Sequence, residues 1–166
     1  MHISNSQVDE REDAATQYLS FSLGDEDFGV DILKVQEIRG WQSVREVPEA
    51  PSFMRGVINL RGLIVPIIDL RNRLGKGETH CTPTTVIIVL KVVSAEAEHT
   101  VGLVVDGVAN VLDIGANEIR PVSSSNIQMS ASYVMGIVSI SDDMVMLLDI
   151  DALFKNNDLN IYENDI

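Results

Sequence analysis

Residues 56–74 read GVINLRGLIVPIIDLRNRL, and eighty residues later 136–154 read GIVSISDDMVMLLDIDALF, with apolar positions that match without a gap. Of the nineteen aligned positions, eight exchange one large apolar residue for another and three are identical: Gly56/Gly136, Val65/Val145 and Asp69/Asp149. A second match, at an offset of 73, aligns FGVDI at 28–32 with VGLVV at 101–105. Because both matches keep their order, the chain is interpreted as a duplication of one unit.

The composition bounds the class of protein. With 166 residues the chain can bury a sizeable core, and 45% of its residues are hydrophobic. No apolar run approaches the ~18 residues that span a bilayer, and the first residues lack the basic and apolar pattern of a secretory signal. The single cysteine, Cys81, cannot form an internal disulfide. A cytoplasmic location without direct membrane insertion is therefore expected.

The charge is strongly negative overall but unevenly distributed. A net charge of −13 argues against a general affinity for nucleic acid or anionic membranes. Residues 34–76 nevertheless hold eight of the twelve basic residues and only four acids, a local balance of +4. Two interpretations stay open: these charges solvate strand faces and turns, or they form a docking surface for an acidic partner, whose affinity would then fall with salt.

Periodicity predicts a mainly β protein. Apolar residues alternate over 18–23 and 28–32, which indicates a hairpin with its turn at 24–27, and 32–38 is expected to be a strand with a bulge or single turn near 33–35. Strands are also expected at 57–60 and 63–70, around an Arg61-Gly62 turn, at 85–92, buried on both faces, and at 101–105. Pro66 should place its strand at an edge or in a bulge. Two small barrels are the expected architecture.

The expected organisation has three parts. Residues 1–16 are expected to be a disordered acidic arm, 17–155 a domain of two intertwined barrels split near 75–84, and 156–166 a weakly ordered tail. A short, poorly anchored helix is expected to begin at Asp151.

The residues give no indication of catalysis. The three histidines lack carboxylate neighbours at a metal-ligand spacing, and phosphate loops, dinucleotide fingerprints and nucleophile elbows are missing. Asp69 and Asp149, which the duplication makes equivalent, could form an acid dyad. An Asp that follows an apolar strand more often caps the next turn by accepting backbone N–H groups, so we expect capping. No enzyme activity, cofactor or metal site is predicted.

Arg61 is the strongest candidate for binding. It lies at the tip of the predicted hairpin, where packing requires no large side chain, and within the basic window. A guanidinium on a rigid turn can bind a carboxylate with two parallel hydrogen bonds, so Arg61 is either an interface anchor or a solvated turn residue.

Three segments carry a resemblance to a known family. GDEDFGVDILKVQEIRG (24–40), GVINLRGLIVPIIDLR (56–71) and VGLVVDGVANVL (101–112) resemble the bacterial chemotaxis coupling protein family CheW. The resemblance covers about residues 17–155. It implies two five-stranded SH3-like barrels that share a hydrophobic core, together with short helices that include a C-terminal one. It also implies a non-enzymatic adaptor that links the cytoplasmic tips of methyl-accepting chemoreceptors to the histidine kinase CheA and supports receptor arrays.

The resemblance also implies site residues. Receptor contact is expected at Val35, Glu37, Ile38, Gly56, Arg61 and Val108, with Glu37 and Arg61 paired across the surface. Contact with the regulatory domain of CheA is expected at Thr85 and Val86, through edge-strand pairing or apolar packing between barrels.

Other functions stay open at this point. The chain could serve a chemosensory pathway with an output other than motility. A nucleic-acid-binding small barrel is an alternative from a different class, but it needs an aromatic, basic groove, and the chain has 5% aromatic residues and a charge of −13.

Overall fold

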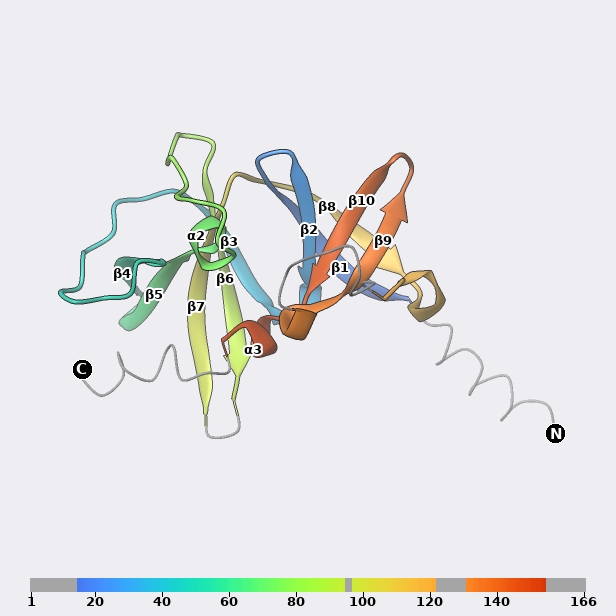
Figure 1. The fold of residues 1–166 in the computed structure, drawn as a ribbon. Coiled ribbons are helices and arrows are strands. Elements are labelled where there is room, and N and C mark those ends of the chain that lie inside the picture. The colour runs from blue at the N-terminus through green and yellow to red at the C-terminus, as the bar shows by residue number, and fades with distance from the viewer. Residues whose placement is uncertain (1–14, 95–96, 122–130, 155–166) are drawn as a thin grey trace.

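The computed structural model describes residues 15–94, 97–121 and 131–154, which form ten strands and a few one-turn helices (Figure 1). The strands are β1 (Thr16–Leu23), β2 (Glu26–Asp31), β3 (Val35–Gly40), β4 (Met54–Leu60), β5 (Leu63–Asp69), β6 (Val86–Val93), β7 (Glu98–Val105), β8 (Gly107–Ile114), β9 (Val134–Ile140) and β10 (Asp143–Leu148). The helical turns are η1 (Ile32–Lys34), α2 (Leu70–Arg73), η2 (Ala116–Glu118), η3 (Ala131–Tyr133) and α3 (Ile150–Leu153). Most of the expected arm and all of the expected tail lie outside the described residues, and Thr16 already begins β1.

The strands form two sheets of five, which we call barrel A and barrel B. Barrel A has the order β8-β1-β2-β10-β9, and barrel B has the order β3-β6-β7-β5-β4. The orders match position by position, and in each sheet one parallel pair, β2 with β10 or β7 with β5, joins otherwise antiparallel ladders. The expected fold of two equivalent five-stranded barrels is confirmed.

Each barrel is assembled from both halves of the chain. β1 and β2 form one sheet with β8, β9 and β10, whereas β6 and β7 form the other with β3, β4 and β5. The chain therefore crosses between barrels at η1 and again at Asp106, between β7 and β8, and we call these two points the crossovers. Residues 75–84 connect α2 to β6 on the side of barrel B. Neither half of the duplication forms a barrel alone.

Local patterns in the sequence account for most elements. β1 and β2 form the expected hairpin, with Leu23 opposite Glu26, and the bulge or turn expected near 33–35 is present as η1 followed by a register shift between Val35 and Glu37. The expectation that 85–92 is buried on both faces is also confirmed, because Ile87 to Leu90 are fully buried.

The expectation for Pro66 is wrong. β5 lies inside its sheet, between β7 and β4, and the register shift in its ladder with β4 falls between Met54 and Gly56. The strand tolerates proline because pairing with β7 begins only at Ile67, while the N–H of Val57, opposite Pro66, donates to the Arg45 carbonyl at 2.8 Å. The missing N–H of Pro66 therefore breaks no ladder bond.

The hydrophobic core has three parts. One small cluster fills barrel B around Ile67 and Val89, and another fills barrel A around Tyr18 and Leu147. A larger cluster, which we call the central core, lies between the barrels and includes the stacked rings of Phe21 and Phe28, whose centroids are 5.8 Å apart. Strand alternation explains this arrangement, since one face of each central strand packs inside its barrel and the other against the neighbouring barrel.

The two equivalent aspartates cap helices, as expected. Asp69 Oδ1 accepts from the Asn72 backbone N–H, and the buried carboxylate also binds the N–H and hydroxyl of Thr79 at 2.9 and 2.7 Å. Asp149 is exposed and accepts from the N–H of Ala152 at 3.2 Å. Each carboxylate serves its own helix rather than a shared dyad.

The expectation of a poorly anchored C-terminal helix is wrong. α3 begins at Ile150, after its Asp149 cap, rather than at Asp151. Ile150, Leu153 and Phe154 are 2%, 1% and 3% exposed and belong to the central core, so this turn is held by burial rather than by length.

Candidate functional site

The β4–β5 hairpin presents Arg61 on a tightly defined turn. Arg61 and Gly62 both have positive φ, 52° and 88°, and the Asn59 side chain accepts from the Gly62 N–H at 2.8 Å. Two residues in this conformation match the twist of antiparallel strands, so the turn is rigid. The Arg61 side chain is 73% exposed, which leaves most of the guanidinium available to a partner.

The expected pair between Arg61 and Glu37 is confirmed. Arg61 Nη2 lies 2.5 Å from Glu37 Oε1, joining the tip of the β4–β5 hairpin to β3. Glu37 Oε2 binds Arg39 Nη1 at 3.2 Å, and Arg39 Nη2 donates to Gln42 Oε1 at 3.1 Å. Sequence reasoning missed Arg39, although its spacing of two residues from Glu37 in a strand already indicates a shared face. Glu37 is thus held from both sides and fixes where Arg61 points.

Ionisation of Glu37 is favoured by these partners. The hydrogen bond from Arg61 lowers the pKa of the Glu37 carboxyl most, desolvation opposes it, and the contact with Arg39 lowers the pKa further. Because the folded pKa is below the unfolded value of about 4.3, the pair contributes stability above that value and loses it as the pH falls through the folded pKa.

We therefore expect the carboxyl of Glu37 to titrate below the ordinary range in the wild-type protein and close to it in Arg61→Ala. Carboxyl carbon shifts followed by NMR between about pH 7 and pH 2 would measure both values. The variant Arg39→Ala should move the pKa in the same direction by less, since Arg61 is the larger cause. Equal values in all three proteins would contradict the pairing.

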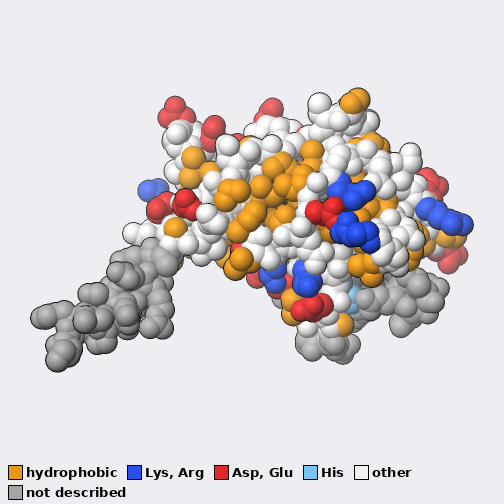
Figure 2. Space-filling model, turned by 180° about the vertical axis from the view of Figure 1, so that it is seen from behind, with side chains coloured by type: hydrophobic (Ala, Val, Ile, Leu, Met, Phe, Trp, Pro, Cys, Tyr) orange, Lys and Arg blue, Asp and Glu red, His pale blue; other side chains and the backbone are white. Residues whose placement is uncertain are grey.

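Three apolar residues of the expected receptor site have different environments. Ile38 is 47% exposed on β3, an edge strand of barrel B. Val35, which begins β3, and Val108, near the start of β8 in barrel A, are half-buried and pack against the central core. Figure 2 shows an apolar area on the back of the molecule, bordered by mixed basic and acidic side chains. The structure brings Glu37 and Arg61 into contact and places Val35 and Ile38 on the same strand as Glu37.

Gly56 is buried, unlike the other expected receptor residues. A Cβ at this position would overlap the carbonyl oxygen of Arg45 and approach the Val44 side chain at 3.1 Å. The close approach permits the two hydrogen bonds between Arg45 and Val57, at 2.9 and 2.8 Å. Gly56 therefore shapes the β4 edge beneath the hairpin and offers no exposed side chain to a partner.

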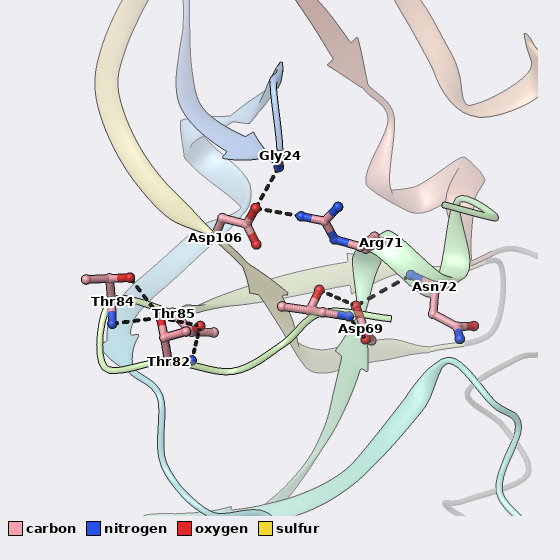
Figure 3. A network of polar contacts seen from close by, with 9 residues as sticks. Gly24, Asp69, Arg71, Asn72, Thr82, Thr84, Thr85 and Asp106 are labelled. Carbon is pink, nitrogen blue, oxygen red and sulfur yellow. Dashed lines mark hydrogen bonds and ion pairs between the residues drawn. The ribbon is translucent and has the colours of Figure 1, made fainter. Parts of the chain in front are cut away.

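The expected kinase residues, Thr85 and Val86, differ in exposure. Thr85 is 2% exposed, and its hydroxyl accepts from the Thr82 N–H at 2.8 Å (Figure 3). Its carbonyl accepts from the Trp41 N–H, so these polar groups are satisfied within the protein. Val86 begins β6, which lies between β3 and β7 and has no free edge, so of the two expected modes of contact only apolar packing stays open for this strand. At the surface, this segment presents half-buried Val86 together with exposed Thr82, Pro83 and Thr84.

The described residues contain neither a candidate metal site nor a candidate membrane-spanning helix. Within 15–94, 97–121 and 131–154, His, Cys, Asp and Glu side chains form no group of three or more that could hold a metal ion. In the same part of the chain no helix has the length and apolar character needed to cross a bilayer.

Comparisons with known proteins assign the chain to a family. Residues 17–158 match the family model of the CheW-like domain. A chemotaxis protein CheW from Klebsiella aerogenes is 39% identical over 153 residues, covering 92% of this chain and 90% of the relative, and a probable chemotaxis protein CheW from Rhizobium etli is 37% identical over 86% and 89%. A crystal structure of the scaffolding protein TtCheW from Thermoanaerobacter tengcongensis has a TM-score of 0.74 and 33% identity over 87% of this chain and 95% of that one. The chain therefore belongs to the CheW-like family of chemotaxis scaffold proteins.

Proposed function

We propose that this protein is a non-enzymatic adaptor that binds the cytoplasmic tips of methyl-accepting chemoreceptors and the regulatory domain of the histidine kinase CheA. It is proposed to act in the cytoplasm, where its partners recruit it to membrane receptor arrays. The observation that carries the proposal is the exposed guanidinium of Arg61, which half-buried Glu37 on the edge strand β3 holds in place. An oriented guanidinium suits a partner helix that offers a carboxylate, and exposed Ile38 on the other face of β3 is available for an apolar contact.

The proposed receptor site combines polar and apolar parts. Arg61 binds the partner's carboxylate, Glu37 keeps Arg61 oriented, and Ile38 supplies apolar contact area. Val35 and Val108 extend the apolar part toward the central core. Gly56 contributes indirectly, through the β4 edge on which the hairpin rests.

The proposed kinase site uses a separate surface. Val86 and the exposed part of its preceding loop, including Thr84, would pack against a barrel of the kinase regulatory domain. Two separate sites on a rigid body can couple receptor conformation to kinase activity only if the adaptor binds the active and inactive assemblies with different affinity.

Reconstitution tests the proposal directly. Receptors from the native host in nanodiscs, CheA and this protein are mixed, and kinase autophosphorylation is measured with and without attractant. We expect the protein to raise kinase activity and to make it sensitive to attractant, and to bind each partner separately in a pull-down. If the folded protein binds neither receptor nor kinase, the proposed function is wrong.

A further inference from the structure

Each crossover between the barrels lies directly before a strand of the proposed receptor site. Lys34 ends η1, and Val35 begins β3 as the next residue. Asp106 separates β7 from β8, and Val108 is the second residue of β8. A contact that holds a crossover in place therefore also determines where the strand after it, β3 or β8, starts.

Asp106 is the centre of the first fixing point. Its Oδ2 accepts from Arg71 Nη2 and from the Gly24 N–H, both at 2.6 Å, and its own N–H donates to the Ser22 carbonyl at 3.0 Å (Figure 3). Arg71 belongs to α2, which follows β5 of barrel B, whereas Gly24 lies in the β1–β2 turn of barrel A. We call Arg71, Asp106 and Gly24 clasp 1.

Asp151 is the centre of a second fixing point. Its Oδ2 lies 2.6 Å from Lys34 Nζ, and its Oδ1 accepts from the Val93 N–H at 2.8 Å. Asp151 belongs to α3, which follows β10 of barrel A, whereas Val93 ends β6 of barrel B. We call Lys34, Asp151 and Val93 clasp 2.

The two clasps occupy equivalent places in the duplicated fold with reversed charges. Arg71 and Asp151 are eighty residues apart and align in the duplication, so a cation stands in one helix where an anion stands in the other. The crossovers also carry opposite charges, with Asp106 in one and Lys34 in the other, although the duplication aligns Lys34 with Gly107, one residue after Asp106. Both clasps join the helix after one barrel, a crossover and a hairpin strand or turn of the other barrel. Charges that only keep the surface solvated need not recur at equivalent places in the two halves of the fold.

We infer that clasp 1 and clasp 2 are positioning elements that fix barrel A relative to barrel B and so hold Val35 and Val108 in the arrangement that a receptor tip recognises. The inference rests on the proposed function. The four charged side chains are 24–33% exposed, so solvent screens the pairs only in part. The Lys76–Glu26 pair joins the segment after α2 to β2 of barrel A, which supports clasp 1, and the bond from Arg73 to the Leu153 carbonyl joins α2 to α3 and so supports the helices of both clasps. We test clasp 2 and leave both of these contacts intact in every variant.

Three substitutions separate the charge from the shape of the clasps. Lys34→Met removes the cation of clasp 2 but keeps its length, and Asp151→Asn removes the anion but keeps an oxygen for the Val93 N–H. Lys34→Arg is the conservative variant. Lys91→Met is the matched control, because Lys91 pairs at 3.5 Å with Glu98, and both residues belong to the β6–β7 hairpin of barrel B.

Two readouts are needed, one for geometry and one for binding. Spin labels at Ser139→Cys in barrel A and Leu63→Cys in barrel B, both exposed, report the distance between the barrels in a Cys81→Ala background. Affinity for a cytoplasmic tip fragment of a chemoreceptor from the native host reports recognition. Urea unfolding of each variant checks that the protein is folded under the binding conditions.

We expect Lys34→Met and Asp151→Asn each to broaden the distance distribution and to weaken receptor binding about fivefold, because a smaller fraction of molecules has the competent arrangement. Lys34→Arg and Lys91→Met should match the wild type in both readouts. An unchanged distribution, with or without a loss of affinity, would overturn the inference. If the wild type itself does not bind the fragment, the receptor part of the proposed function fails, while the distance measurement still decides whether the clasps fix the barrels.

Discussion

Arg61→Glu is expected to weaken binding to a receptor tip fragment by about 2 kcal/mol or more while leaving the free energy of unfolding close to that of the wild type. The substitution removes the exposed guanidinium and places a carboxylate beside Glu37, whose Oε1 now lies 2.5 Å from Arg61 Nη2. Like charges at that distance repel each other and also the partner's carboxylate. Isothermal titration calorimetry gives the affinity, and urea unfolding gives the stability.

The duplication provides a matched control for this prediction. Ser141 occupies the equivalent turn of barrel A with φ of 55°, against 52° at Arg61. Ser141→Glu therefore adds a carboxylate in the same backbone conformation without touching the proposed receptor site, and it should bind the fragment like the wild type. Exchanging the charges in Glu37→Arg with Arg61→Glu re-forms an ion pair at the hairpin tip, although it places a second guanidinium beside Arg39, and it should not restore binding. Wild-type affinity of Arg61→Glu would remove Arg61 from the site.

Gly56→Ala and Gly136→Ala are each expected to lower the free energy of unfolding by about 3 kcal/mol in the absence of any partner. A Cβ at Gly136 would lie 2.5 Å from Ile119 Cγ2 and 2.7 Å from the Arg120 carbonyl oxygen, and one at Gly56 would overlap the Arg45 carbonyl. In both places the added methyl group must displace the chain that bridges the edge strand, at Arg45–Val57 and Arg120–Ile137.

Gly40→Ala is the control for the glycine variants. Gly40 lies at the end of β3, and a Cβ there would meet no atom within 4 Å, so the change should be close to neutral. Urea unfolding followed by circular dichroism measures all three variants. If Gly56→Ala keeps wild-type stability and loses only receptor binding, Gly56 acts at the interface and is not needed for the close approach of Arg45 to β4.

The strands and turns were predictable because their signals are local. Alternation over 18–23 and 28–32, the Arg61-Gly62 turn and the capping positions of Asp69 and Asp149 each depend on residues a few positions apart. The two wrong predictions, for Pro66 and for α3, also have physical causes. Pro66 is tolerated inside a sheet because its ladder with β7 starts one residue later, and α3 is anchored by contacts with strands far away in the sequence.

The candidate site was predictable only in part. Family resemblance and the hairpin position indicated Arg61 and Glu37, and the structure confirmed their pairing. Thr85 could not be placed from the sequence, because its burial depends on how residues 82–85 fold back on one another. Arg39 was missed although its partner Glu37 lies two residues away in the same strand, whereas the clasps were missed because their partners lie in other elements, up to 117 residues away for Lys34 and Asp151.

The order of the amino acids determines the duplication, the strand content, the turn positions and the absence of a recognisable reactive motif, because periodicity and turn chemistry are properties of short segments. It does not reveal the exchange of strands between the two halves, since the parallel pairing of β2 with β10 joins segments more than a hundred residues apart and leaves no local pattern. That exchange creates the central core, the crossovers and the clasps, and with them the relative placement of Val35 and Val108.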